Sequence, residues 1–305
     1  MNEKIFRDTR TQIGILISRG VIIRNKSKAK KLLRSVNYYN LINGYKTPFI
    51  KQNKPYEKYI EGTRLEEIFS VYEFDRKLRI LTLEVILEIE KKIKSLVAYH
   101  FSKIYGHKDY LIYKNFNTDG VNKYKQVSNL LSKLHQQIFI NIDNEVAIKH
   151  YADGKNHIPL WVLVNSMSMG DISKFYANMK SSDKIMVAKL FKWGIRENQL
   201  SNCLYFVSNI RNRCAHDELL YSYITHATLS DNKYFKYFRI TYANNYFAFI
   251  ISIKMLLSKK DFDIFVNNLD KLFVELNSNL HTITLNKVKK LMGIPNNWKK
   301  LQALN

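Results

Sequence analysis

RLEEIFSVYEFDRKLRILTLEVILEIEKKIKSLVAYHFSKI, residues 64 to 104, decides the fold class of this 305-residue chain. Apolar side chains recur every three or four positions through the stretch, which contains neither proline nor glycine. This period is that of an amphipathic helix, so the stretch predicts a helix of about 60 Å, long enough to contain a kink or a break. The apolar stripe consists of Leu65, Ile68, Phe69, Tyr72, Leu83, Ile86, Leu87, Ile93 and Val97.

The whole chain has only 4 prolines and 10 glycines, which is few for the many tight turns of a β-sandwich or barrel. We therefore predict an all-α fold in three segments: a basic N-terminal helical module at 1–60, a helical domain at 61–260 and a C-terminal helical segment at 261–305. Within the helical domain we expect the first helix at 64–104, an insertion at 105–158 and a second long helix at 197–220.

Caps and breakers predict finer boundaries. Ser27 is expected to cap a helix at 28–36. Pro159 and Gly170 are expected to begin and end a helix, with Asp171 capping the next one. The other helices that we predict lie at 122–137, 242–257 and 261–278.

Four charged side chains interrupt or border the apolar stripe of the first helix: Asp75, Arg76, Arg79 and Glu90. A charge on a buried face is unfavourable unless another charge pairs with it. We expect Arg76 and Arg79 to pair with acids such as Asp75, and RNA contact is an equal alternative for both. Glu90 needs a partner from another element, and Arg211 is the candidate.

The chain is strongly basic, with 49 Lys and Arg against 26 Asp and Glu and a formal charge of +23. A field of this size attracts polyanions. Residues 24–34 hold six basic residues and no acid, and the tail at 285–305 holds five lysines and no acid. We predict nucleic-acid contact, with the Lys-rich composition of AT-rich genomes as the alternative explanation. The predicted binding residues of the N-terminal module are Arg24, Lys26, Lys28, Lys30, Lys31 and Arg34.

Other protein classes are disfavoured by what the sequence lacks. Cys203 and Cys214 are its only cysteines, so neither a disulfide framework nor a cysteine-based zinc site is indicated. No HExxH, Asp-rich cluster or Cys/His set has ligand spacing, and we expect no metal and no cofactor. The apolar run at 247–257 is interrupted by Lys254 and is too short to cross a bilayer. Without a signal-peptide pattern, we expect a soluble, cytoplasmic protein with no membrane partner.

A cationic cluster interrupts the second long helix, in VSNIRNRCAHDELLY at residues 207–221. Asn212 and Arg213 lie four and three positions before His216, so both fall on its side of the helix. Arg211 is rotated from His216 by about 140° and approaches it only through its long side chain. Guanidinium groups bind phosphate through two parallel hydrogen bonds, and imidazole transfers protons near neutral pH.

These side chains suit metal-independent cleavage of RNA. A base takes the proton of a 2′-hydroxyl, the 2′-oxygen attacks the adjacent phosphorus, and an acid protonates the leaving 5′-oxygen while guanidinium groups stabilise the negative charge. The motif is short, and its spacing alone favours structural roles. Arg211 shares a helix face with Leu200, Leu204 and Val207, which is compatible with a buried ion pair to Glu90.

The segment IRNRCAH resembles the Arg-x4–6-His motif of HEPN ribonucleases, in the form where Asn follows Arg. Other blocks resemble the Abi-like family of bacterial abortive-infection proteins (the AbiD/AbiF type), and the resemblance covers about residues 27 to 301. Asn165 departs from the acidic residue expected in the Pro-x-Trp helix, which puts any role of that position in doubt. The matching blocks are NYYNLINGYKTPF (37–49), YEFDRKLRILTLEVILEIEKKIKSLVAYHFS (72–102), PLWVLVNSMSMGDISKFY (159–176) and MGIPNNWKKL (292–301).

The resemblance implies a HEPN-type helical bundle that cleaves RNA without metal, in a toxin-antitoxin-like phage-defence system. Supporting roles are expected for Arg213 on phosphate, Asp217 as an orienting group and Glu90 as the partner that holds Arg211. Because HEPN nucleases combine two copies of the motif, a homodimer is implied. RNA is the expected substrate, and a small structured noncoding RNA is an expected partner at the basic N-terminal module. Catalytic roles are implied for Arg211, Asn212 and His216.

Two other functions stay open at this level. One is an RNA-binding regulator with the same fold that does not cut RNA, which the high charge supports equally. The other is a scaffold within a larger defence complex. The complete Arg-Asn-x3-His motif favours the nuclease, since a protein that only binds RNA does not need the histidine.

Overall fold

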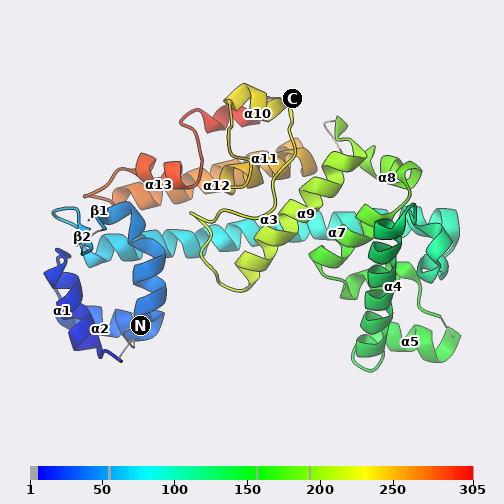
Figure 1. Cartoon of the computed structure of the whole chain (residues 1–305), viewed down its shortest axis with the longest axis horizontal. Helices are drawn as coiled ribbons and strands as arrows, with labels where there is room; N and C mark the ends of the chain where they lie inside the picture. The colour runs from blue at the N-terminus through cyan, green and yellow to red at the C-terminus, as the bar shows by residue number, and fades with distance from the viewer. Residues whose placement is uncertain (1–5, 54–55, 156, 192–193, 305) are drawn as a thin grey trace.

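Helix α3, Leu65–Tyr105, is the spine of an elongated molecule (Figure 1). The structure is a computed structural model that describes residues 6–53, 56–155, 157–191 and 194–304. The predicted helix at 64–104 is confirmed within one residue at each end, and it runs for 41 residues without a break. Leu65, Ile68, Ile86, Ile93 and Val97 of its apolar stripe are buried, whereas Phe69, Tyr72 and Leu83 are half-buried and Leu87 is exposed. The all-α fold class is therefore confirmed, with one two-stranded sheet among the described residues.

The N-terminal module packs at one end of α3 (Figure 1). Its strands β1 and β2 pair antiparallel, with Ile50 opposite Tyr59. The predicted cap at Ser27 is wrong, because Asn25 accepts the N–H of Lys28 at 2.9 Å and α2 begins one residue before Ser27. The elements are α1 Thr9–Ser18, α2 Lys26–Val36, the π-helical turn η1 Tyr39–Asn43, the 3-10 turn η2 Thr47–Phe49, β1 Ile50–Gln52 and β2 Lys58–Tyr59.

Short helices surround the opposite end of α3 (Figure 1). The predicted helix at 122–137 is confirmed as the longer α4, whereas α5 was not predicted. The predicted helix start at Pro159 is confirmed, since Pro159 is the N-cap of α6. The predicted end at Gly170 and cap at Asp171 are wrong: Ser168 caps α7, so Gly170 and Asp171 lie in its first turn. The elements are η3 Asp109–Leu111, η4 Tyr113–Asn115, α4 Val121–Asn141, α5 Val146–Lys155, α6 Leu160–Leu163, η5 Val164–Ser166, α7 Met169–Asn178 and α8 Ser181–Ala188.

Helix α9, Glu197–Ala215, crosses α3 and packs between α7 and α11 (Figure 1). Every residue of α11 is buried, so the apolar run at 247–257 belongs to the core. Within the described part of the chain, no helix combines the length and apolar character needed to cross a membrane. The predicted helices at 242–257 and 261–278 correspond to α11 and α12. The C-terminal elements are α10 Lys233–Phe238, α11 Tyr246–Leu256, α12 Lys259–Ser278, α13 Leu285–Leu291 and η7 Trp298–Gln302.

The buried apolar side chains form one continuous cluster that extends from Ile13 to Leu301. Helix α12 runs along α3 and brings the C-terminal segment against the spine (Figure 1). The three sequence segments therefore share a single core, and α9 is held inside it along most of its length.

Candidate functional site

The motif lies at the C-terminal end of α9, where a buried helix emerges at the surface. Leu200, Leu204 and Val207 are fully buried and fix the helix against the core. Arg211 continues the same face and is half-buried, whereas His216, at the helix end, is exposed. The core therefore holds α9 in place and leaves the polar side chains of its last turn at the surface.

Helix α9 ends at Ala215, so the predicted extent to residue 220 is wrong. Asp217 takes a left-handed conformation with φ of 54°. Its N–H donates to the carbonyl of Cys214 at 3.4 Å, and the N–H of Glu218 donates to the carbonyl of Arg213 at 3.0 Å. These bonds form a Schellman-type helix end, which places His216 at the C-cap with the chain turning away behind it.

Arg211 approaches the long helix α3 through Glu90. Its Nε lies 3.9 Å from the Glu90 Oε2, and the other carboxylate oxygen binds the Lys94 Nζ at 2.8 Å. The predicted Glu90–Arg211 pairing is confirmed as a long ion pair, too long for a hydrogen bond. Both Arg211 Nε and Glu90 Oε2 are buried and without a hydrogen-bond partner among the described residues.

Arg213 and Asn212 occupy different surroundings. The Arg213 guanidinium forms an ion pair with Glu218 and lies 3.9 Å from the ring centroid of Tyr223. Asn212 is exposed, and its backbone carbonyl accepts the N–H of His216 at 3.0 Å. Cys214, between them and the histidine, is buried, and burial raises the pKa of its thiol to about 12. The residue is therefore part of the packing of α9 against the core.

A buried polar network holds the chain just after the motif. The carboxylate of Asp75 accepts the backbone N–H of Leu220 at 3.1 Å and of Tyr221 at 2.7 Å. It also accepts the Tyr45 hydroxyl at 2.8 Å and the Arg79 Nη1 at 2.6 Å. Burial raises the pKa of the Asp75 carboxyl, and Arg79 with the other donors opposes that shift. The network fastens the segment after His216 to α3.

Arg79 joins this network to the motif, since its Nη2 donates to the Asp217 carboxylate at 2.6 Å. The predicted pairing of Arg79 with Asp75 is confirmed. Arg79 is only 3% exposed, so its guanidinium is not available for surface contact with RNA. The alternative that Arg79 binds RNA is therefore wrong. Arg76 pairs with Glu73 at 2.8 Å instead of Asp75, because Asp75 points into the core while Arg76 is exposed.

The structure also assigns Asp217 a different contact from the one expected. Its carboxylate binds Arg79, and no hydrogen bond from it to His216 is found among the described residues. The segment that follows the motif was expected to orient the histidine through a side chain. Instead, the backbone turn at Asp217 sets the position of His216.

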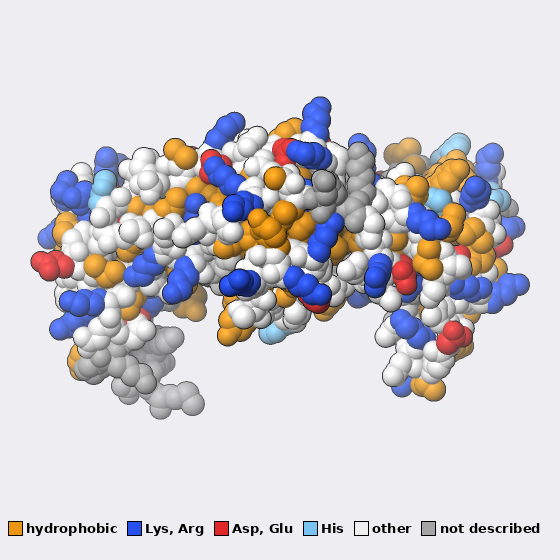
Figure 2. All heavy atoms as spheres, turned by 90° about the horizontal axis from the view of Figure 1, so that it is seen from above, with side chains coloured by type: hydrophobic (Ala, Val, Ile, Leu, Met, Phe, Trp, Pro, Cys, Tyr) orange, Lys and Arg blue, Asp and Glu red, His pale blue; other side chains and the backbone are white. Residues whose placement is uncertain are grey.

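The predicted nucleic-acid-binding residues of the N-terminal module do not lie at the motif. They lie on or just before α2, at the end of the elongated molecule (Figure 1). Lys30 is half-buried and the other five are exposed. Lys and Arg side chains are scattered along the whole face seen in Figure 2, so basic surface is not confined to the predicted set.

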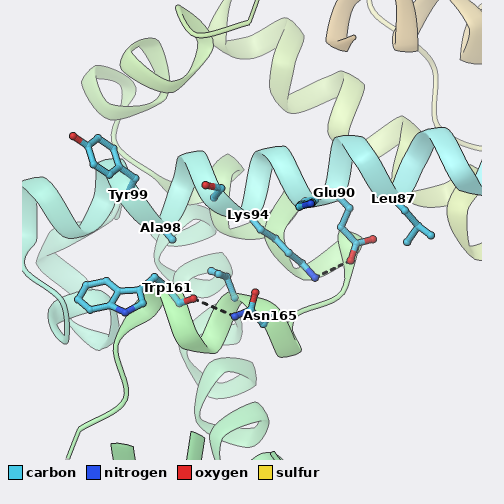
Figure 3. A pocket seen from close by; sticks show the side chains of 10 residues that line it. Leu87, Glu90, Lys94, Ala98, Tyr99, Trp161 and Asn165 are labelled. Atoms are coloured by element: carbon cyan, nitrogen blue, oxygen red, sulfur yellow. Dashed lines mark hydrogen bonds and ion pairs between the residues drawn. The ribbon is translucent and has the colours of Figure 1, made fainter. Parts of the chain in front are cut away.

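A cleft of 690 Å³ opens beside Glu90, between α3 and the α6–η5 segment (Figure 3). Lys91 and Lys94 line it from α3, and Trp161 and Asn165 line it from the other side. Sequence reasoning did not single out Lys91, Lys94 or Trp161 as site residues. The available signal was the position of both lysines on the helical stretch that carries Glu90, one and four residues after it.

No group of three His, Cys, Asp or Glu side chains that could hold a metal ion is found in the described ranges. The arrangement thus offers an exposed imidazole, two guanidiniums and an amide at one helix end. This combination can bind a phosphate and move a proton.

Fold and site together define an all-α protein with a cationic motif at the surface end of a core helix. A family model described as "Abi-like protein" matches residues 31–222, from α2 to just beyond the motif. The match covers more than half of the chain, so the chain belongs to the Abi-like family. Membership suggests a role in abortive infection. No curated protein and no solved structure matches the chain.

Proposed function

We propose that this chain is a metal-independent endoribonuclease of the HEPN type that acts in abortive infection. The observation that carries the proposal is the position of His216. It is exposed at the end of α9, within two helical turns of Arg211 and Arg213. The left-handed turn that follows it at Asp217 is held against α3 by hydrogen bonds to Arg79 and Asp75. A histidine with only a structural role would not need to be held at the surface by these contacts.

In the proposed reaction, the 2′-hydroxyl of RNA loses its proton and its oxygen attacks the adjacent phosphorus. His216 transfers a proton, and Arg211 stabilises the negative charge on the phosphoryl oxygens. Asn212 lies one turn before His216 and is exposed on the same side of the helix. Arg213 needs to leave Glu218 before it can bind phosphate, so its contribution is to substrate binding.

The motif of one chain holds one imidazole, whereas the reaction needs both a base and an acid. We therefore propose a homodimer in which the His216 side chains of two copies supply them. The measurement is the molar mass in solution by light scattering. A monomer at the concentration that gives full activity would contradict this part of the proposal.

A second candidate is a regulator that binds RNA without cleaving it. The observation in its favour is that both guanidiniums of the motif have acidic partners, Glu90 for Arg211 and Glu218 for Arg213. A basic α2 surface away from the motif is also compatible with binding alone.

The test compares cleavage of total RNA by the natural chain and by His216→Ala in excess EDTA, with the ends of the products mapped. We expect cuts that leave 2′,3′-cyclic phosphates and a rate that falls by roughly 10²- to 10⁴-fold in the variant. His226→Ala is the matched control, because His226 is also exposed but lies outside α9. Intact RNA with tight binding by all three proteins would favour the regulator.

A further inference from the structure

The cleft beside Glu90 is lined by Lys91, Lys94 and Trp161, to which the proposed cleavage reaction gives no role. Figure 3 shows Lys94 and Glu90 projecting from α3, with Trp161 and Asn165 across from them on the α6–η5 segment. Glu90 also reaches Arg211 at 3.9 Å. Glu90 therefore lines the cleft and also contacts the arginine proposed to bind phosphate.

Trp161 is the aromatic wall of this cleft. The residue is 48% exposed, although an aromatic side chain gains much from burial. Its ring centroid lies 6.2 Å from that of His107, and the residue lines the cleft. An exposed aromatic ring next to cationic side chains is the arrangement on which unpaired nucleic-acid bases stack.

Glu90 gives an independent indication of a ligand. The residue is only 7% exposed, and its Oε2 is buried without a hydrogen-bond partner among the described residues. Buried carboxylate oxygens are normally hydrogen-bonded; Oε2 lacks a donor within the described part of the chain, and Arg211 at 3.9 Å is too far to supply one. A ligand that reaches Glu90 from the cleft could supply the missing donor. A ribose 2′-hydroxyl is a donor of this kind and distinguishes RNA from DNA.

The charges at the cleft favour an anion. Lys91, Lys94 and Arg211 contribute three positive charges against the single negative charge of Glu90, which leaves two in excess. Lys91 is exposed and forms no ion pair within the described ranges. A phosphate that enters between the lysines is attracted, and it needs no acidic group to be displaced from Lys91.

We propose that this cleft binds one nucleotide of a single-stranded RNA next to the phosphate held by Arg211. Its base stacks on Trp161, its phosphate contacts Lys91 and its ribose hydroxyl donates to Glu90. The inference rests on the proposed function in that it names the binding site for the strand to be cut. It assigns a function to a part of the chain, α6–η5, that lies outside the motif.

A second copy of this chain fits the cleft less well than RNA does. Such a contact would bury Lys91, and the one acid among the described residues that line the cleft, Glu90, already pairs with Lys94. Removing an unpaired ammonium group from water is unfavourable.

The experiment measures equilibrium binding of a short fluorescein-labelled single-stranded RNA at fixed salt, with all variants made in the His216→Ala chain so that no strand is cut. We expect Trp161→Ala to weaken binding about tenfold or more through loss of stacking. Trp161→Phe, which keeps a ring, should retain most of the affinity. A plot of log affinity against log salt concentration has a negative slope, and Lys91→Ala should make that slope less steep by roughly 0.7.

Two controls match the substitutions. Lys103→Ala removes an exposed lysine from another side of α3, and Tyr242→Ala removes an aromatic ring that is 73% exposed elsewhere. Both should leave the affinity within twofold of the parent chain. Since 48% of Trp161 is exposed, a circular dichroism spectrum identical to that of the parent chain is expected for Trp161→Ala.

The proposal is overturned if Trp161→Ala binds RNA as tightly as the parent, or if it loses RNA affinity only because a dimer dissociates, as measured by light scattering. The second result would make the face an interface between copies. The assay reads no cleavage, so the failure of the nuclease proposal and the failure of this binding site give different results.

Discussion

Arg79 and Asp217 are joined by a contact of 2.6 Å between Nη2 and Oδ1, although 138 residues separate them in the chain. The other end of the same guanidinium binds the buried Asp75 at 2.6 Å. Arg79 of α3 thereby holds Asp217, the first residue after His216, in place.

Replacing Arg79 by Leu is expected to destabilise the fold by about 3–5 kcal/mol, because it leaves the Asp75 carboxylate buried without its charge partner. The measurement is the midpoint of urea unfolding. Arg76→Leu is the matched control: it removes an exposed arginine and its pair with Glu73, and should change stability by less than about 1 kcal/mol. Equal losses in the two variants would contradict the importance of the network.

The left-handed conformation of Asp217 predicts an order between two substitutions. Asp217→Gly and Asp217→Ala both remove the carboxylate that binds Arg79, but only alanine has a Cβ that is strained at a φ of 54°. We expect the glycine variant to be more stable than the alanine variant by roughly 1 kcal/mol. Thermal unfolding of both chains measures the difference. An alanine variant as stable as the glycine variant would disprove the helix end described for α9.

Glu67 links the start of α3 to the C-terminal region and should make stability depend on pH. Its carboxylate accepts the backbone N–H of His281 and Thr282, each at 2.7 Å, and the Thr282 hydroxyl at 2.6 Å. Burial raises the pKa of the Glu67 carboxyl. These hydrogen bonds, together with one from the backbone N–H of Arg64, lower it by more, so the net pKa lies below its ordinary value. The stabilisation is therefore complete above the unfolded pKa of about 4.3 and is lost as the pH falls through the lowered folded value.

Glu67→Gln should reduce the free energy of unfolding at pH 7 by about 1–3 kcal/mol, since the neutral amide is a weaker acceptor and carries a donor that cannot be satisfied there. The gap between the two chains should narrow below pH 4, as urea unfolding across pH will show. Glu88→Gln, an exposed site on the same helix, is the control. A gap that stays constant from pH 7 to pH 3 would mean that Glu67 does not act through its charge.

The two cysteines should be unreactive in the folded chain. Burial raises the pKa of Cys203 and of Cys214 to about 12 each, and the thiolate is the reactive form. At pH 8 we expect iodoacetamide to modify neither thiol on the time scale that labels both in guanidinium chloride, as followed by mass spectrometry. Rapid labelling of Cys214 in the native chain would reopen a redox role within the motif.

Local patterns were sufficient for the long helices but not for their caps. The apolar period at 64–104 depends only on neighbouring residues, so α3 was predicted within one residue at each end. The end of α9 was missed because the left-handed residue that follows a helix is usually glycine, whereas here Asp217 takes that conformation. Asn25 and Ser27 are both good capping residues, and only the path of the backbone chose Asn25.

The candidate site was predicted in the same uneven way. Two buried charges on facing elements suggested that Glu90 pairs with Arg211, and they do approach one another. By contrast, Arg79 was expected to contact an acid or RNA, and its link to Asp217 was not expected. No period or spacing relates two residues so far apart. The cleft at Trp161 was missed for a related reason, because its two walls come from α3 and α6.

The sequence by itself determined the all-α class, the basic character and the position of the Arg-Asn-x3-His motif, since each depends on composition or on neighbours within one helical turn. Tertiary structure decided which arginine is buried, where α9 ends and which groups share a cleft with Glu90. These outcomes depend on how α3, α6 and α9 pack. Packing brings together residues from distant parts of the chain, and their charges then pair because leaving them buried alone is unfavourable.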